Sequence, residues 1–334
     1  IGILGSLFVL RGYIDAVDSP EWATWVTPFG WLEHVAPATE NNPWPLLLAL
    51  TTFVALMAYA FWLQARRDFG QGLIAPKRGP ARGGWESTLP GLVTRLNAGS
   101  LITWLLAFVV LGFVFGFVAT AVGEVLQANP AMAQALAGGA VTEADLTAQF
   151  LSTVLSLAGI IAAISGVQVA MRIYAEERND RVDPLLAGSV TRPAYFSANA
   201  VLALAGSALA LLIAGSVIAT LASDQADLGW GQVFGQAAAT IPATWVLVAL
   251  ALAAIGARPE VRLVGWLGLV ASFALTILGP LFRIWDWILG ISPFWHVPNV
   301  TAAAPDWSGM AWLALALAVL TAIGFVGFRR RDIV

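Results

Sequence analysis

The chain has 334 residues, of which 59% are hydrophobic and 11% charged, whereas a soluble domain carries about 25% charged residues. Its formal net charge of −3 gives little information on function in a chain that is mostly apolar. The sequence contains no cysteine, which excludes disulfides, thiol catalysis and cysteine-ligated metal.

Eight apolar runs predict eight transmembrane helices, because a helix of about 20 apolar residues crosses a bilayer with every backbone polar group satisfied. In chain order they are Ile1–Val17, Trp44–Leu63, Ser100–Val122, Phe150–Val169, Ala198–Leu221, Val233–Ala254, Leu263–Leu281 and Ala311–Phe328. The sequence lacks the alternating apolar and polar pattern of a membrane β-barrel. The predicted fold class is an all-α polytopic membrane protein.

Two segments between predicted spans, Asp18–Pro45 and Arg283–Trp307, are rich in Trp, Pro and Gly. They are too apolar for plain loops and too broken for spans, so each is predicted to form a re-entrant or interfacial hairpin on the outer face. Their candidate residues are Trp31, His34, Trp295 and His296. An aromatic belt that only sets helix depth is the alternative to a gate or a substrate exit. For the two histidines, a hydrogen-bonded interfacial side chain is the alternative to a pH-sensing or metal-binding role.

The C-terminal part of the sequence repeats the N-terminal part. Phe8, Trp22 and Phe29 recur as Phe273, Trp287 and Phe294 at an offset of 265, and Arg66-Arg67-Asp68 recurs as Arg330-Arg331-Asp332. Such self-similarity indicates two structural halves. Residues 1–69 are then the last two spans of a first half, whose remainder is expected upstream of Ile1. Residues 70–97 form a linker and a connecting segment, and residues 98–334 form a complete six-helix half.

The basic residues predict the orientation. Of 17 Lys and Arg residues, 15 lie in four islands that alternate connections carry: Arg66–Arg95, Arg172–Arg192, Arg258–Arg262 and Arg329–Arg331. Arg11 and Arg283 are the exceptions. By the positive-inside rule the islands are predicted to face the cytoplasm.

Several kinds of chemistry have little support in the sequence. The six predicted spans from Ser100 onward contain no ionisable residue, which an ion-driven carrier normally needs, although backbone carbonyls can also bind Na⁺. The only lysine, Lys77, lacks the spacing of a phosphate-binding loop. We therefore expect no enzyme activity, cofactor or metal site in this chain and no nucleic-acid partner. An ion-coupled secondary transporter, a membrane scaffold and a lipid-processing subunit remain alternatives to a permease energised by a partner.

The loop 172–195 is the best candidate for docking a partner. Acidic and basic residues mix between Glu176 and Asp183, and Asp183-Pro184 suits a helix start with Asp as the N-cap. Leu185 and Leu186 give that short helix an apolar face, and Gly188 would end it. The alternative is an ordinary positive-inside loop whose acids balance its arginines.

This loop resembles that of ABC exporter permeases of the drug and polyketide-antibiotic class. The similarity lies in Glu176-Glu177-Arg178 followed by Asp-Pro-Leu-Leu-Ala-Gly-Ser-Val-Thr-Arg at 183–192, and the chain most resembles the two-half, tetronasin-resistance-type permeases of actinobacteria. One departure is Asn179-Asp180, where many relatives have Gly. The resemblance implies twelve spans in two halves and export of hydrophobic drugs, antibiotics or lipid-like compounds. It also implies a coupling helix that docks on a separate ATP-binding subunit, a homodimer that holds ATP and Mg. The coupling residues it implies are Glu176, Glu177, Arg178, Asp183, Leu185, Leu186 and Arg192.

Two further assignments concern the start of the second half. The resemblance implies an amphipathic connecting helix over Trp85–Asn97, with Leu89, Leu92, Val93 and Leu96 toward lipid and Arg95 toward headgroups. On the following span, Gly112 and Gly116 form a small-xxx-small pair that predicts close helix packing. Lipid-facing aromatics are the alternative to a substrate path lined by Trp104, Phe113, Phe115 and Phe117.

Overall fold

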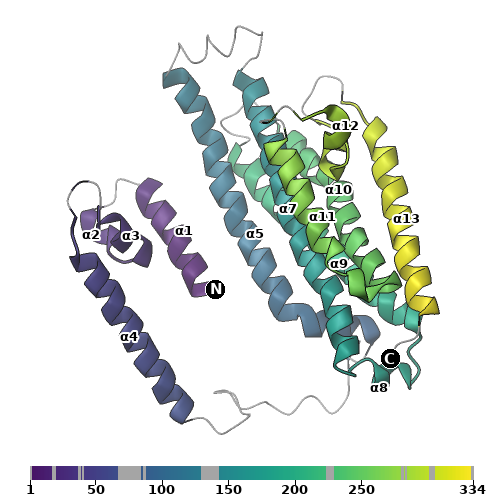
Figure 1. Ribbon diagram of the computed structural model, residues 1–334. Helices are drawn as coiled ribbons and strands as arrows, with labels where there is room; N and C mark the ends of the chain where they lie inside the picture. Colours follow the sequence, from purple (N-terminus) through teal and green to yellow (C-terminus); the bar gives the residue numbers. More distant parts are fainter. Residues whose placement is uncertain are drawn as a thin grey trace. The chain divides into compact units, whose positions relative to one another are not determined.

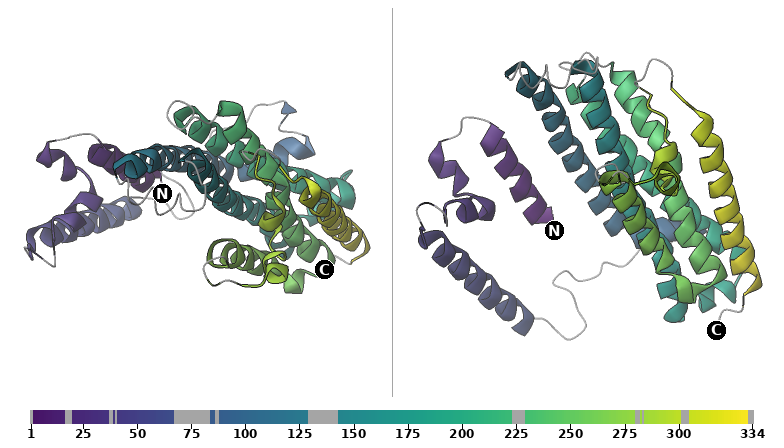
Figure 2. Two further views of the ribbon diagram at one scale, coloured as in Figure 1. Left: turned by 90° about the horizontal axis from the view of Figure 1, so that it is seen from above. Right: turned by 45° about the horizontal axis from the view of Figure 1, so that its top comes forward.

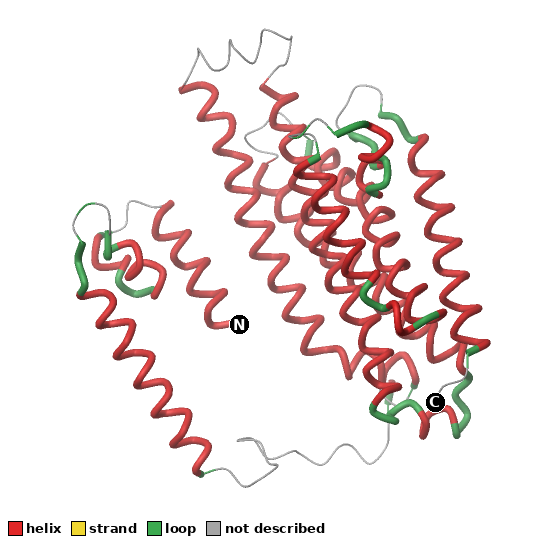
Figure 3. Tube along the Cα trace, viewed as in Figure 1, coloured by secondary structure: helices red, strands yellow, loops and turns green. Residues whose placement is uncertain are grey.

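The computed structural model describes residues 2–16, 20–36, 39, 41–66, 84–85, 88–128, 143–222, 229–279, 282, 284–300 and 305–331. These residues form helices and loops and contain no strand (Figure 3). The chain divides into two compact units, Ile1–Gly83 and Gly84–Val334. Seven helices among the described residues are long and apolar enough to cross a membrane. The predicted fold class, an all-α polytopic membrane protein, is confirmed.

The first unit contains α1 (Gly2–Ala16), α2 (Glu21–Thr24), α3 (Pro28–Glu33) and α4 (Trp44–Ala65). α4 is one of the seven helices of membrane-spanning length, and none of its most apolar stretch is buried by this chain. α1 occupies the first predicted span but has 15 residues, fewer than a span needs. Both predicted runs are therefore helical, and one of them has the full length of a span.

The second unit is a helical bundle (Figures 1 and 2). Its long helices are α5 (Leu89–Ala128), α7 (Glu143–Arg178), α9 (Arg192–Ala222), α10 (Trp230–Ala257), α11 (Val264–Phe273) and α13 (Ser308–Arg330). The most apolar stretch of α10 is 78% buried, against 17% in α5 and in α13, so α10 lies at the centre. Glycine lets the backbones approach closely there: a Cβ on Gly256 of α10 would overlap the carbonyl oxygen of Gly324 in α13. Small residues thus explain the tight core.

Two predicted elements differ from the structure. The span expected over Leu263–Leu281 begins with a 3₁₀ turn, η2 (Pro259–Val261), continues as α11 and ends in η3 (Ala274–Leu278), which is π-helical. The expected connecting helix is continuous with the first span of the unit, because α5 starts at Leu89; Figure 1 shows the ribbon bending at this end of α5.

The predicted orientation of this first part of α5 is wrong for two residues. Val93 is only 4% exposed, and Leu89 packs against the core of the bundle. Leu96, in contrast, is exposed as predicted. Leu89 and Val93 therefore face the neighbouring helices, on the side where Asn97 is also buried.

The two ends of the second unit have different chemistry. We call one the basic end, where Arg331 reaches Glu177 of α7 and the Arg262 guanidinium lies 4.4 Å from the centre of the Tyr174 ring. The other, the hairpin end, carries α12 (Asp286–Leu289) and the 3₁₀ helix η4 (Pro293–His296) (Figure 1). The basic islands 172–192, 258–262 and 329–331 thus meet at one end of this unit, as the sequence predicted.

Candidate functional site

The helix α7 ends in a defined hydrogen-bonded turn at the start of the loop. The Asp180 N–H donates to the carbonyl of Glu177 and the Arg181 N–H to that of Glu176, each over 3.0 Å. This is a Schellman motif, which requires a left-handed residue, and Asp180 has a φ of 56°. The departure at Asn179-Asp180 therefore leaves the helix end intact, because Asp takes the conformation that suits Gly.

The short helix α8 (Asp183–Leu186) follows two residues later. Its N-cap is Val182, which is buried, and Asp183 is the first helical residue without a side-chain cap bond, so the predicted start was off by one residue. Leu185 and Leu186 are half-buried and pack against the core of the bundle. The structure therefore does not give them the outward apolar face that the sequence predicted.

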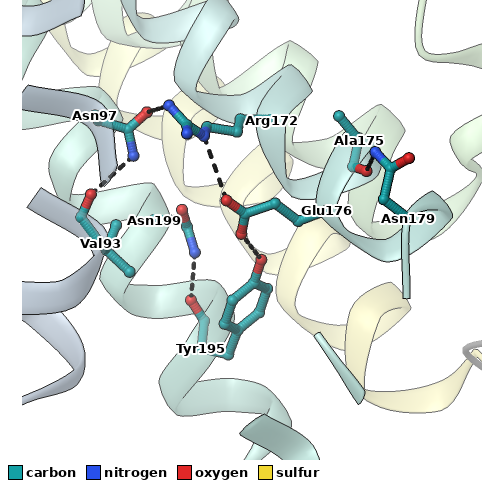
Figure 4. A network of polar contacts seen from close by, with 8 residues as sticks. All are labelled: Val93, Asn97, Arg172, Ala175, Glu176, Asn179, Tyr195 and Asn199. Carbon is teal, nitrogen blue, oxygen red and sulfur yellow. Dashed lines mark hydrogen bonds and ion pairs between the residues drawn. The ribbon is translucent and has the colours of Figure 1, made fainter. Parts of the chain in front are cut away.

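A polar network under this turn joins three helices (Figure 4). The Arg172 guanidinium of α7 donates to Asn97 Oδ1 of α5 over 3.4 Å and to Glu176 Oε1 over 3.3 Å. The Tyr195 hydroxyl of α9 donates to Glu176 Oε2 over 2.8 Å. Both carboxylate oxygens of Glu176 therefore have partners within the chain. Asn97 in turn donates to the carbonyl of Val93, which ties the start of α5 into the network.

A second set of contacts joins the loop to the end of the chain. Arg331 Nη2 lies 2.6 Å from each carboxylate oxygen of Glu177, and Arg192 Nη1 donates to the backbone carbonyl of Arg331 over 2.7 Å. The side chains of Glu177 and Arg331 are only 7% and 16% exposed. Glu176 and Glu177 therefore support the loop from inside, and their contact with a partner stays a prediction.

The outer face of the loop is polar and exposed. It consists of Arg178, Asn179, Asp180, Arg181, Asp183, Pro184, Ala187, Gly188 and Ser189. A hollow of about 560 Å³ lies beside this face, lined by Asp183, Leu186, Val190, Thr191 and Arg192. Of the seven predicted coupling residues, Arg178 and Asp183 are therefore the two that are exposed.

The four aromatic residues predicted to line a path on α5 do not share one environment. Phe113 and Phe117 are 43% and 56% exposed, whereas Phe115 is half-buried and packs beside Ala119 and Leu151. Trp104 donates its indole N–H to Gln168 Oε1 of α7 over 2.9 Å. Their part in substrate transport stays a prediction.

The predicted glycine pair on α5 does form a helix contact. A Cβ on Gly112 would lie 2.8 Å from the Cβ of Val217, and one on Gly116 would lie 2.6 Å from Leu221 Cδ1, both on α9. The small residues therefore let α5 lie close to α9.

Gln168 is a candidate residue that the sequence analysis missed. It is exposed although it lies within the predicted span Phe150–Val169, about 15 Å from the end of α7 at Arg178 by the helical rise per residue. An amide at that depth needs a polar partner, since lipid provides none. Its signal in the sequence was available: it is the one side-chain amide in that apolar run.

The two hairpin segments repeat each other in structure as well as in sequence. α2 and α12 cover equivalent residues at the offset of 265, and each is followed by a turn with Pro28 or Pro293 at the first helical position. The cap positions correspond too: Thr27 accepts a hydrogen bond from the Gly30 N–H, three residues later, and Ser292 accepts one from the Phe294 N–H, two residues later. The repeat therefore reflects a conserved backbone path within each segment.

The candidate hairpin residues have partners inside their own segments. His34 Nε2 lies 2.7 Å from Thr24 Oγ1, and its ring stacks on Trp25, whose carbonyl accepts the Trp31 indole N–H over 2.6 Å. His296 Nε2 donates to the carbonyl of Gly290 over 2.9 Å. These contacts favour hydrogen-bonded interfacial histidines.

The second hairpin also carries an apolar hollow and a helix cap. Trp295 is half exposed, and His296 lines a hollow of about 290 Å³ together with Trp312 and Leu313 of α13. Before α13, hydrogen bonds from Ser308, the backbone N–H first and the side chain second, hold the pKa of Asp306 below its usual value.

Comparison with known proteins identifies the family. The family model described as the multidrug efflux system permease Rv1217c, C-terminal domain, matches residues 87–329, which is more than half of the chain. The chain is also 36% identical over 336 aligned residues to the multidrug efflux system permease protein Rv1217c of Mycobacterium tuberculosis (strain ATCC 25618 / H37Rv), an alignment that covers 99% of this chain and 61% of that protein. The chain thus spans about three fifths of the length of this relative. It belongs to the family of multidrug efflux permeases defined by the Rv1217c C-terminal domain.

Proposed function

We propose that this chain is part of the transmembrane permease of an ATP-driven ABC exporter. A separate nucleotide-binding subunit, a homodimer that holds ATP and Mg, energises it, and the cargo is a hydrophobic drug, antibiotic or lipid-like compound. In this proposal the full permease has twelve spans in two halves and lies in a bacterial plasma membrane. The basic end faces the cytoplasm, because lysine and arginine concentrate on that side of membrane proteins.

The observation that carries the proposal is the outer face of the loop 172–195. Arg178, Arg181 and Asp183 present charges of both signs to solvent at the basic end, on a backbone that buried contacts of Glu176 and Glu177 hold in place. Exposed charges on a rigid support suit specific recognition of another protein, since they fix its register and exclude wrong partners. The loop is therefore the docking site of the nucleotide-binding subunit.

The absence of ionisable residues from the apolar interior of the six second-unit spans supports an external source of energy. Phe113, Phe117 and the Trp104–Gln168 pair are the residues of α5 and α7 that we assign to the cargo path. Exposed rings suit an apolar cargo body, and the Gln168 amide suits a hydrogen-bonding group on it.

Charge reversal on the outer face of the loop tests the docking site. The double variant Arg178→Glu, Asp183→Lys in the full-length permease should reduce copurification of the nucleotide-binding subunit and ATP-driven dye export about tenfold or more, because like charges then oppose each other in the interface. The matched control is Asp286→Lys, which reverses an equally exposed carboxylate at the hairpin end and should leave both unchanged.

Unchanged copurification and export in the double variant would reject the docking site. Export that continues without ATP and stops when the ion gradient is removed would reject the ABC assignment in favour of a secondary transporter. Absence of any dye export from the wild-type complex would favour a scaffold or a lipid-processing subunit.

A further inference from the structure

The last helix of the chain is held at the basic end by charged contacts that the predicted docking role did not include. Arg331, the residue directly after α13, contacts both oxygens of Glu177 from a position 154 residues away in the sequence. Arg192, at the start of α9, donates a hydrogen bond to the backbone carbonyl of Arg331. We call these three residues the clasp. It joins the two ends of the loop 172–195 to the end of α13.

The clasp is a strong contact for physical reasons. Its carboxylate and guanidinium are largely buried, so removing either one would leave the other charge without a partner in a poorly solvated place. The guanidinium of Arg331 also lies 5.0 Å from the centre of the Phe328 ring, which in turn stacks on Phe196. Both ion pairing and aromatic packing therefore fix the position of Arg331.

The rest of α13 is held differently. In the half of α13 nearer the basic end, Gly324 and Gly327 pack against the backbone of α10, at Leu252 and Ala257. Such small-residue contacts allow close approach but have no charge to fix the position of one helix along the other. Near the hairpin end, a Cβ on Gly309 would overlap the backbone of His296. α13 therefore runs from the clasp to the second hairpin over about 35 Å, given its 23 residues.

We propose that Arg331 is a positioning residue whose bond to Glu177 makes α13 move with the loop 172–195, so that motion of the loop at the basic end reaches the second hairpin. The part of this proposal in which a nucleotide-binding subunit moves the loop rests on the proposed function. The clasp itself does not, because all of its contacts lie within this chain. Arg331 acts through Glu177 and contacts neither cargo nor nucleotide.

Distances between spin labels test the clasp. Because this chain contains no cysteine, Ala175→Cys at the start of the loop 172–195 and Arg329→Cys on α13, both exposed, can be labelled in the full-length permease once any cysteine outside this chain is replaced. In the labelled protein that keeps Glu177 and Arg331, the distribution of distances between the two labels should be narrow. It should stay the same when ATP and vanadate are added to the complex. Glu177→Gln and Arg331→Gln should broaden it, and the exchange Glu177→Arg, Arg331→Glu should restore it.

Coupling between ATP hydrolysis and transport gives a second readout. Glu177→Gln and Arg331→Gln should lower the dye exported per ATP hydrolysed about fivefold or more. This ratio is measured per copurified nucleotide-binding subunit, so that a change in docking does not enter it. The charge exchange should restore this ratio, and Arg331→Lys should retain more of it than Arg331→Gln if the exchanged protein does not fold. The control is Glu260→Gln, which neutralises an exposed carboxylate at the same end.

The two proposals fail in different ways. Narrow distances and a normal coupling ratio in both Gln variants would overturn the clasp and leave the docking site standing. Loss of the nucleotide-binding subunit from the unsubstituted permease would overturn the proposed function, while the distances measured without nucleotide would still decide whether Glu177 and Arg331 hold α13 to the loop.

Discussion

The two ends of the second unit are held together by different chemistry. At the basic end, Glu176 and Glu177 of α7 and Arg331 after α13 are largely buried, and Tyr195 and Arg192 of α9 add hydrogen bonds. At the hairpin end, the buried contact is neutral: Gln236 of α10 donates to the Pro298 carbonyl over 3.1 Å and accepts from the Val300 N–H over 2.7 Å. Charged side chains are buried where several polar groups offset the cost of removing them from water. A single side-chain amide is sufficient where only two backbone groups have to be held in place.

The largest expected effect is at the basic end. Glu177→Ala leaves the Arg331 guanidinium buried without its carboxylate, so the free energy of unfolding should fall by about 3–5 kcal/mol. Thermal unfolding in detergent measures this. Glu260→Ala, at an exposed carboxylate, is the control and should change stability by less than about 0.5 kcal/mol. Equal melting temperatures would mean that the ion pair contributes little.

A smaller effect is expected when the neutral contact is broken. Gln236→Leu removes the partner of two backbone groups in the second hairpin and should lower the free energy of unfolding by about 2 kcal/mol. Gln149→Leu, an exposed amide at the start of α7, is the matched control. Hydrogen exchange at Val300 should also accelerate in Gln236→Leu alone. A variant as stable as the control would show that the hairpin holds its own shape.

A single hydrogen bond in the same region should count for less. Thr276 Oγ1 lies 2.9 Å from Ser292 Oγ, and Thr276→Val should lower the free energy of unfolding by about 1 kcal/mol. Thr103→Val is the control, because the Thr103 hydroxyl donates only within its own exposed helix turn. If both variants have the same melting temperature, the hydrogen bond between Thr276 and Ser292 does not stabilise the hairpin.

The smallest effect has the opposite sign. Asp180→Gly places a residue without a Cβ in the left-handed position after α7, and it should raise the free energy of unfolding by about 0.5 kcal/mol. Asp183→Gly, within α8, should lower stability because Gly is unfavourable in a helix. A lower melting temperature for Asp180→Gly would mean that the Asp180 side chain has a role that its backbone conformation does not reveal.

The sequence predicted the spans and the repeat well because both depend on local patterns. Apolar runs placed the six long helices of the second unit, and the content of Trp, Pro and Gly marked the two broken segments that form short helical turns. The correspondence of the cap positions Thr27 and Ser292 follows from the offset of 265.

The sequence could not predict which way charged residues face at the end of a helix. The resemblance implied Glu176 and Glu177 as coupling residues, and it could not show that both carboxylates bond within the chain, to Tyr195 and to the distant Arg331. Val93 and Leu185 likewise pack inward because helices far apart in the sequence meet there. Such facts depend on tertiary packing, which a single sequence does not show.

The π-helical stretch Ala274–Leu278 has a consequence for the symmetry of the two copies of the repeat. Its counterpart in the first copy, residues 9–13, is ordinary α-helix, although the offset of 265 is the same before and after it. A π turn takes up more residues per revolution than an α turn. Equal lengths of chain are therefore wound by different amounts, and each hairpin emerges from its own helix in a different direction. The two copies of the repeat are thus alike in the order of their residues, but the helix before the hairpin segment is wound differently in each.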